Sequence, residues 1–369
     1  MRFLHTGDLH LDSAFSSVGA LDSASRRVAQ RELLKRIFNL AEKENCDMML
    51  IAGDLFDSPY VSPETAALCI ELFESFGRPV FISPGNHDPY TAGSFYATAH
   101  LPKNVHVFSS AELESVELFE PAVTVFGYAF GSSSLLLSPL SAAASDKRGT
   151  RILCAHGDLE VPTSRYAPVM LSDLRRHGFD YVALGHVHNV ENGHNAVRYC
   201  GFPEGRSFDE LGEGGVLTVE LEAGGEPVVT RHKVCSQRYQ WETLSVDGVG
   251  DPDQLRGMIE KKLLEYAGGV PTHLRLELVG TLPIDELPEL SAAESYEGIA
   301  SLSLIDNTLH LPDGGYLEKD ATIRGEFYRS LRSWLFSEEP DKRALAFKAL
   351  RIGLAAIDGK DFVQGGEDR

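Results

Sequence analysis

Five short segments of the sequence contain side chains of the types that bind metal ions. They are Gly7-Asp8-Leu9-His10, Gly53-Asp54-Leu55-Phe56-Asp57, Gly85-Asn86-His87-Asp88, Ala155-His156-Gly157 and Gly185-His186-Val187-His188. Carboxylate, imidazole and amide oxygen together suit manganese, iron or zinc, whereas oxygen ligands alone would suit magnesium or calcium. A lone Gly-Asp is usually a turn and a lone histidine is usually structural, but five such segments in series indicate one metal centre.

Each of these segments follows a run of residues that the apolar pattern predicts to be a strand. These strands are expected at residues 1–6, 47–52, 79–83, 151–155 and 180–184. Helices are expected at 24–44 and 63–76, so strands and helices alternate as in an α/β fold. Because ligands gather at the carboxyl ends of strands in such sheets, the five segments are expected to converge on one site.

Further short strands at 105–109, 122–128, 196–200, 215–222 and 227–234 indicate two sheets packed face to face. We therefore expect an α/β (α+β) fold in which a two-sheet β-sandwich is flanked by helices. Residues 131–149 are expected to form a loop with a short helix.

The pattern changes near residue 236, where a smaller α/β unit is expected to begin. A strand at 238–246, a helix at 251–267 and a strand at 272–280 would form it. Two helices are expected within 322–357, and the first has one apolar face made of Phe327, Tyr328, Leu331, Trp334 and Leu335. The predicted domains are thus 1–235, 236–320 and a helical tail at 321–369.

The composition indicates an ordinary globular protein but carries a strongly negative charge. The formal net charge is −20, with 32 acidic and 20 basic residues in 1–250 and 22 and 14 in the remainder. This balance argues against tight, unaided binding to a long DNA duplex. The five cysteines are widely spaced, and no apolar run is long enough to span a membrane. The N-terminal sequence Met-Arg-Phe-Leu-His turns polar at once, without the apolar region of a signal peptide. These features favour a reduced, cytoplasmic protein with no membrane segment.

The motifs GDLHLD, GDLFD, GNHD, AHGD and GHVH resemble the signature of calcineurin-like metallophosphoesterases. More narrowly, the sequence is similar to the SbcD-type DNA-repair exonucleases, in particular their YhaO-like branch. Residues 201–215 look like a degraded form of a glycine-rich segment of that branch. The unit after residue 236 sits where these nucleases carry a cap domain. The resemblance implies the calcineurin-like metallophosphoesterase fold, with a C-terminal α/β cap and a helical tail.

The resemblance also implies a role for each motif residue. Asp8, His10 and His188 would hold one divalent ion; Asn86, His156 and His186 would hold the other; Asp54 would bridge them. A hydroxide shared by the two metals would attack the phosphorus, and His87 would protonate the leaving group as general acid. Asp57 would pair with His87, or else cap a turn. Asp88 is expected to be an orienting or structural residue rather than a ligand, and Arg206 either a turn residue or a phosphate contact.

The motifs and the composition leave two functions open. The first is a manganese-dependent DNA exonuclease or endonuclease in DNA repair, with iron or zinc as alternative metals. The family implies an SbcC-type coiled-coil ATPase as partner, docked on the helices of 322–357, and a possible homodimer; the alternative for these helices is that they fold back onto the cap. The second function is a small-molecule phosphodiesterase or phosphatase, which suits the acidic composition. A Ser/Thr phosphatase is disfavoured because its GDxVDRG and GNHE motifs are absent.

Overall fold

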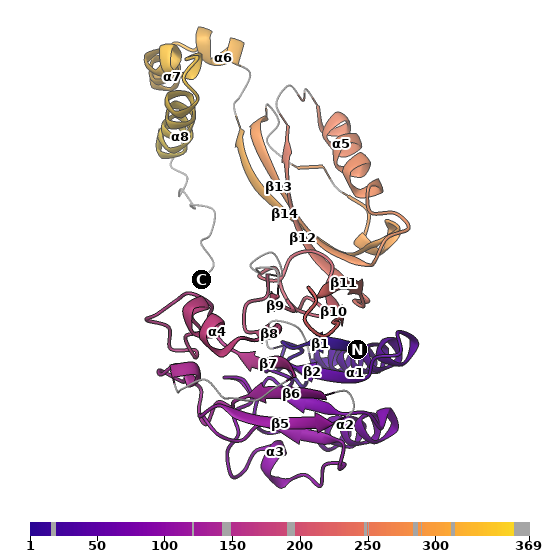
Figure 1. Cartoon of the computed structure of the whole chain (residues 1–369). Helices are drawn as coiled ribbons and strands as arrows, with labels where there is room; N and C mark the ends of the chain where they lie inside the picture. Colours follow the sequence, from indigo (N-terminus) through magenta and orange to yellow (C-terminus); the bar gives the residue numbers. More distant parts are fainter. Residues whose placement is uncertain are drawn as a thin grey trace. The chain divides into compact units, whose positions relative to one another are not determined.

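The computed structural model describes residues 1–15, 20–119, 122–141, 149–189, 196–246, 249, 251–282, 287–288, 290–310 and 314–357. The chain divides into two compact units, Met1–Arg238 and Tyr239–Arg369 (Figure 1). The first unit contains the five motifs.

The first sheet of this unit has six strands in the order β11-β10-β1-β2-β3-β4. Its strands are β1 (Arg2–Thr6), β2 (Met48–Ile51), β3 (Val80–Ile82), β4 (Val105–Val107), β10 (Gly215–Glu220) and β11 (Val228–Lys233). The strands β1 to β4 run parallel, whereas β10 pairs antiparallel with both β1 and β11. The loops that follow β1, β2 and β3 therefore lie side by side at the carboxyl ends of these strands.

The second sheet has five strands in the order β5-β6-β7-β8-β9. They are β5 (Glu114–Phe119), β6 (Ala122–Gly127), β7 (Thr150–His156), β8 (Tyr181–Gly185) and β9 (Val197–Tyr199). The strands β6 to β9 are parallel, and β5 is an antiparallel edge strand.

The two sheets pack face to face, which confirms the predicted sandwich. One buried cluster joins side chains of both sheets, such as Leu50 and Phe81 with Ile152 and Tyr181. Because β2, β7 and β8 are buried on both faces, they read as nearly continuous apolar runs.

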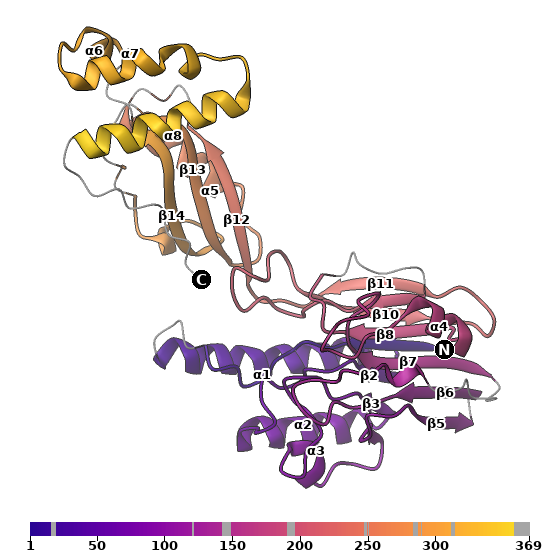
Figure 2. The ribbon, with the colours of Figure 1, turned by 90° about the vertical axis from the view of Figure 1, so that its left-hand side faces the viewer.

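Helices cover the outer faces of the sandwich (Figure 2). They are α1 (Ala20–Lys43), α2 (Pro63–Phe76), α3 (Phe95–Thr98), α4 (Leu171–His177) and the 3-10 helix η1 (Pro139–Ser141). The helices α1 and α2 contact each other and bury Leu34, Phe38 and Phe73 against the first sheet. Ser62 caps α2 by accepting the N–H of Thr65, and Gly77 ends the helix with a left-handed φ of 61°.

The second unit contains a three-stranded sheet in the order β12-β13-β14. Its elements are β12 (Arg238–Ser245), α5 (Pro252–Leu264), β13 (Thr272–Leu282), η3 (Ala293–Ser295), β14 (Ile299–His310), α6 (Gly314–Lys319), α7 (Ile323–Leu335) and α8 (Pro340–Ile357). Buried Leu255, Ile259 and Leu263 of α5 pack on Leu274 and its neighbours in β13.

The helices of the tail pack mainly on one another. Tyr328 and Leu335 of α7 are buried against Leu350 of α8, and α8 also contacts β14. Much of the predicted apolar face of α7 is therefore covered within this unit. Trp334 and Phe336 stay exposed, at 47% and 71%.

Two strands were not predicted from the sequence, namely β5 and β14. Part of the expected loop, residues 142–148, lies outside the described residues. Each of the five cysteines is a free thiol. Among the helices that the structure describes, none combines the length and apolarity needed to cross a membrane.

Candidate metal centre

The motif residues lie in loops at the carboxyl ends of five parallel strands. Asp8 and His10 follow β1, Asp54 follows β2, and Asn86 follows β3. In the second sheet, His156 ends β7 and His186 follows β8. Backbone hydrogen bonds join these loops: the Asp8 N–H donates to Gly53 O at 3.0 Å, and the His10 N–H donates to Asp54 O at 2.9 Å.

Several of these residues adopt a backbone conformation that non-glycine residues rarely use. The φ angles are 51° at Asp8, 46° at His10, 47° at Asp54 and 99° at His186. Each left-handed residue costs conformational free energy, and such residues concentrate where function requires a fixed side-chain direction. This concentration supports a functional site at this edge of the sandwich.

Asp54, Asn86 and His156 converge on one point. His156 Nε2 lies 3.0 Å from Asn86 Oδ1 and 3.3 Å from Asp54 Oδ2. Burial opposes protonation of His156, but the charges of Asp54 and Asp8 raise its pKa to about 9. Burial likewise favours neutral Asp54, yet His156 holds the pKa of that carboxyl well below its usual range.

Asp8, His10 and His188 form a neighbouring cluster. Their ligand atoms lie within 4.8 Å of one another, and so do those of Asp8, Asp54 and His156. Two buried carboxylates this close repel each other unless a cation lies between them. Among the described residues, His10 Nε2 is buried without a hydrogen-bond partner. The donor set and this unsatisfied nitrogen fit divalent metal ions.

Hydrogen bonds fix which ring nitrogen each histidine would offer. His156 Nδ1 lies 3.0 Å from the Ala52 carbonyl oxygen, which can only accept a hydrogen bond. The Nδ1 atoms of His10 and His188 lie 3.0 Å from Asp57 Oδ1 and 2.9 Å from Glu210 Oε1, respectively. In all three residues an oxygen acceptor therefore holds Nδ1–H and leaves Nε2 directed at the cluster, as is common for metal-binding histidines.

Asp57 contacts His10 more closely than it contacts His87. Its Oδ1 is 3.0 Å from His10 Nδ1, 3.3 Å from Arg206 Nη1 and 3.6 Å from His87 Nδ1. The expected pairing of Asp57 with His87 is thus the longest of the three contacts. His87 has a side-chain exposure of 46% and donates its backbone N–H to Asp54 Oδ1 at 2.9 Å.

His87 also lies within 4.8 Å of the ligand atoms of His10 and Asp54, so its place beside the cluster is clear while its role stays a prediction. His186 packs on His156 with ring centroids 5.0 Å apart, and its backbone N–H donates to the Asp8 carboxylate. None of the His, Asp and Glu groups found among the described residues includes His186.

Asp88 is an organising residue of the loops rather than a member of these groups. It accepts the N–H of Gly85 at 2.7 Å, the N–H of Phe56 at 3.1 Å and the hydroxyl of Tyr96 at 2.5 Å. Burial and the nearby Asp54 charge raise its pKa to about 7. Asp88 thus ties the loop after β2 to the loop after β3.

Two acidic residues near the cluster were not assigned a role from the sequence. Glu210 contacts His188, and Asp158 Oδ1 lies 3.5 Å from His186 Nε2. Both belong to motifs that were recognised, AHGD and the glycine-rich segment after residue 201. The sequence motifs could therefore have drawn attention to both carboxylates. Only the folded loops show which histidine each carboxylate contacts.

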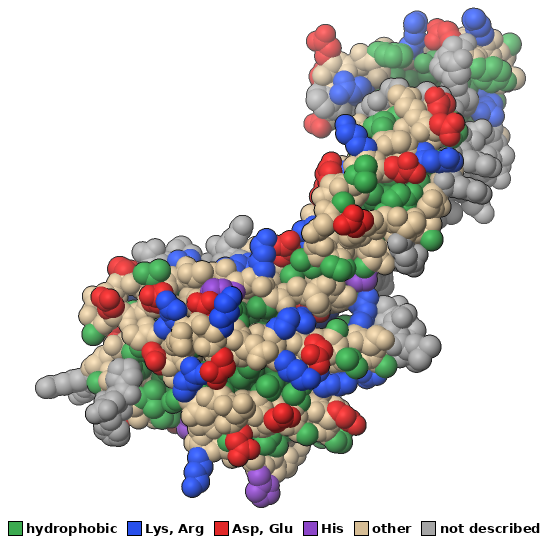
Figure 3. All heavy atoms as spheres, turned by 90° about the vertical axis from the view of Figure 1, so that its right-hand side faces the viewer, with side chains coloured by type: hydrophobic (Ala, Val, Ile, Leu, Met, Phe, Trp, Pro, Cys, Tyr) green, Lys and Arg blue, Asp and Glu red, His purple; other side chains and the backbone are tan. Residues whose placement is uncertain are grey.

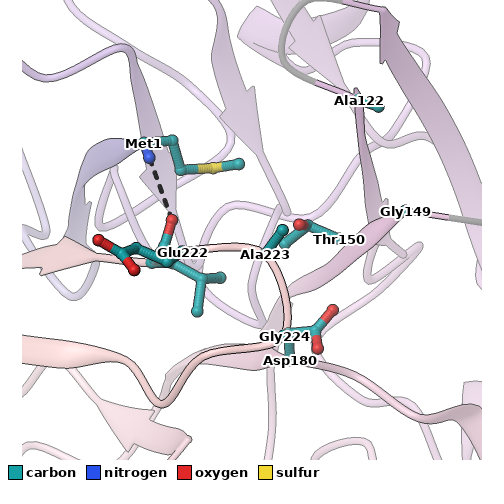
Figure 4. A pocket seen from close by; sticks show the side chains of 9 residues that line it. Met1, Ala122, Gly149, Thr150, Asp180, Glu222, Ala223 and Gly224 are labelled. Carbon is teal, nitrogen blue, oxygen red and sulfur yellow. Dashed lines mark hydrogen bonds between the residues drawn. The ribbon is translucent and has the colours of Figure 1, made fainter.

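A separate pocket of 640 Å³ lies at the opposite edge of the sheets (Figure 4). It is lined by residues near the amino ends of strands, such as Met1 before β1, Thr150 in β7 and Asp180 before β8. Because the motif loops follow the carboxyl ends of the strands, this pocket is not part of the candidate metal centre.

Comparison with known sequences agrees with a metal centre in these loops. Residues 1–190 match the calcineurin-like phosphoesterase family. The chain is 29% identical over 304 residues to the uncharacterized metallophosphoesterase YhaO of Bacillus subtilis, which covers 77% of this chain and 72% of that protein.

Two further relatives carry names that refer to DNA cleavage or repair. The SbcD component of the SbcCD nuclease of Bacillus subtilis is 25% identical over 277 residues, covering 61% of this chain and 67% of that protein. The DNA double-strand break repair protein Mre11 of Saccharolobus solfataricus is 26% identical over 243 residues, covering 59% and 60%. The family match spans more than half of the chain and contains all five motifs. The chain belongs to the calcineurin-like phosphoesterase family of hydrolases.

Proposed function

We propose that this protein is a two-metal phosphodiesterase that hydrolyses DNA in DNA repair, as a manganese-dependent exonuclease or endonuclease. The observation that carries the proposal is the convergence of Asp54, Asn86 and His156 beside the Asp8, His10 and His188 cluster. One ion would be held by Asp8, His10 and His188, and the other by Asn86, His156 and His186, with Asp54 between them. When bound, the two ions supply an acidified water as nucleophile and neutralise charge on the phosphate.

His87 is proposed to protonate the leaving group. Its Nδ1 faces Asp57 Oδ1 at 3.6 Å, so Nε2 is the atom that would carry the proton. As the bond between phosphorus and the leaving oxygen breaks, that oxygen takes the Nε2 proton and departs as an alcohol. The half-exposed position of His87 suits this role, because the substrate must reach it from solvent.

The choice of DNA as substrate rests on the relatives named as part of the SbcCD nuclease and as Mre11. The charge of −20 favours the second candidate, a small-molecule phosphodiesterase or phosphatase. On the face drawn in Figure 3, Lys and Arg side chains lie interspersed with Asp and Glu side chains. A DNA substrate would therefore need help from the metal ions or from a second protein.

An SbcC-type coiled-coil ATPase is the proposed partner, since the relatives carry the name SbcCD. The side chains of Trp334, Phe336 and Ile352, which are exposed on α7 and α8 or directly after α7, supply apolar area for such a partner. The contact between α8 and β14 supports the alternative that these helices fold back onto the cap. A homodimer and a cytoplasmic location remain predictions.

The test is turnover by the purified full chain with manganese. The substrates are a 5′-labelled DNA oligonucleotide and bis-p-nitrophenyl phosphate, and the control variants are His87→Ala and His100→Ala, an exposed histidine outside the motifs. DNA degradation that His100→Ala retains and His87→Ala lacks would support the nuclease. Hydrolysis of the small diester alone, unchanged when an SbcC-type ATPase is added, would instead support the small-molecule enzyme.

A further inference from the structure

Arg206 lies between two carboxylates that come from different loops. Its Nη2 and Nε lie 2.6 Å and 3.1 Å from Glu210 Oε1, and its Nη1 lies 3.3 Å from Asp57 Oδ1. The Arg206 backbone N–H also donates to Glu210 Oε2 at 2.7 Å. The guanidinium thus connects a loop of the first sheet to the glycine-rich segment near residue 210.

Each of these carboxylates holds a candidate metal ligand on its other side. Asp57 accepts from His10 Nδ1 at 3.0 Å, and Glu210 lies 2.9 Å from His188 Nδ1. The result is a continuous series of contacts, His10–Asp57–Arg206–Glu210–His188. Its two ends are the histidines whose ligand atoms gather with Asp8.

Burial makes this arrangement depend on the arginine. The Glu210 side chain is only 4% exposed, so its oxygens depend on protein donors rather than on water. Arg206 supplies such donors with paired N–H groups, which fix the plane of the Glu210 carboxylate. A fixed Glu210 carboxylate in turn fixes the ring and tautomer of His188.

Among the described residues, the guanidinium of Arg206 is linked through Asp57 and Glu210 to ligands of the Asp8, His10 and His188 cluster. His156 is oriented by the Ala52 carbonyl, and its Nε2 meets Asn86 and Asp54. None of these contacts involves Arg206. A loss of Arg206 should therefore affect the two candidate metal positions unequally.

We propose that Arg206 is a positioning residue that holds His10 and His188, through Asp57 and Glu210, in place for the ion of the Asp8 cluster. This role differs from both roles expected from the sequence, a turn residue and a phosphate contact. Three of the guanidinium's five N–H groups already serve carboxylates, which favours positioning over binding of substrate. The proposal rests on the two-metal site of the proposed function.

The test is calorimetric titration of manganese alone into full-length protein stripped of metal by a chelator. Wild type is expected to bind two ions. Arg206→Gln is expected to bind one of them about 10- to 100-fold more weakly, as when outer contacts of metal ligands are removed, and to leave the other within about twofold. Arg231→Gln is the matched control, because Arg231 donates to the Glu213 carbonyl and contacts neither Asp57 nor Glu210 in the described structure.

If Arg206→Gln bound both manganese ions with wild-type affinity, the proposal would be overturned. Equal weakening of the affinity for both ions would also overturn it, because it would indicate a general structural role. If Arg206→Gln does not fold, Glu210→Gln replaces it, since glutamine keeps an acceptor for His188 but loses the charge that Arg206 binds. It should weaken the same single ion, and unchanged binding would again overturn the proposal. The titration contains no nucleic acid, so its outcome does not depend on whether the protein cleaves DNA. If the wild-type protein bound no manganese, the metal site itself would be refuted.

Discussion

Gly85 lies so close to Asp54 that a methyl group on Gly85 would stand 2.2 Å from Asp54 Oδ1. The same methyl group would stand 2.8 Å from the Asp54 backbone nitrogen. The loops after β2 and β3 can therefore approach each other only when residue 85 has no side chain. This contact sets the distance between Asp54 and the neighbouring Asn86.

Gly85→Ala is accordingly expected to displace the Asp54 carboxylate and to abolish phosphodiester hydrolysis. Manganese affinity should decrease by about 10- to 100-fold or more, because the ligands no longer converge. Gly93→Ala is the matched control, since nothing lies within 4 Å of a Cβ there. Steady-state hydrolysis of bis-p-nitrophenyl phosphate and manganese titration measure both effects, and normal turnover by Gly85→Ala would contradict the proposed bridging role of Asp54.

Asp54→Ala removes the one carboxylate proposed to contact both ions. We expect hydrolysis to decrease to the background rate while the fold persists, because apolar side chains form the buried clusters that hold the helices and sheets together. Circular dichroism checks the fold, and hydrolysis with manganese checks the activity. Near-normal turnover by this variant would refute the two-metal mechanism.

His87→Ala is expected to reveal its role through the leaving group. With DNA, whose leaving alkoxide needs a proton, the rate should decrease by about 10²- to 10⁴-fold. With a p-nitrophenyl ester the decrease should be much smaller, because p-nitrophenolate leaves without protonation. Manganese affinity should stay unchanged. An equal loss on both substrates together with weaker manganese binding would show that His87 is a metal ligand instead.

His5 gives the stability of the fold a defined pH dependence. It lies in β1 and is fully buried, and its ring nitrogens contact the Tyr181 hydroxyl and the Leu184 carbonyl. Burial lowers its pKa from 6.5 to about 3. The unfolded chain therefore binds a proton below pH 6.5 that the folded protein does not take up until the pH nears 3.

Above pH 6.5 His5 is neutral in both states and does not lower the free energy of unfolding. As the pH decreases from 6.5 toward 3, protonation of His5 in the unfolded chain lowers the free energy of unfolding by about 1.4 kcal/mol per pH unit. Urea unfolding of metal-free protein between pH 4.5 and 7.5 measures this slope. In His5→Gln, the free energy of unfolding should change with pH as if one proton fewer were taken up on unfolding than in wild type. Exposed His100→Gln should match wild type. Parallel curves for wild type and His5→Gln would contradict the assignment.

The sequence alone was sufficient to predict the two-sheet sandwich and the types of residue at the candidate site. The strands before the motifs are short, buried and apolar, so local patterns predict them, and a residue that follows a parallel strand must lie at its carboxyl end. The strands β5 and β14 were missed because each carries several polar or charged side chains, as in Glu114 and Glu117 or Asp306 and Asn307. Pairing with neighbouring strands stabilises them, and such pairing is not a local property.

Only the tertiary structure decided which side chains contact one another. Asp57 was expected to serve His87 but lies closer to His10, and Arg206 reaches Asp57 across 149 positions of sequence. These contacts depend on loops whose residues adopt left-handed φ angles, as at Asp8, His10 and Asp54. Apolar periodicity and spacing carry no information about such angles. Local sequence therefore supplied the candidate ligands, whereas the packing of five loops determined how each one is oriented.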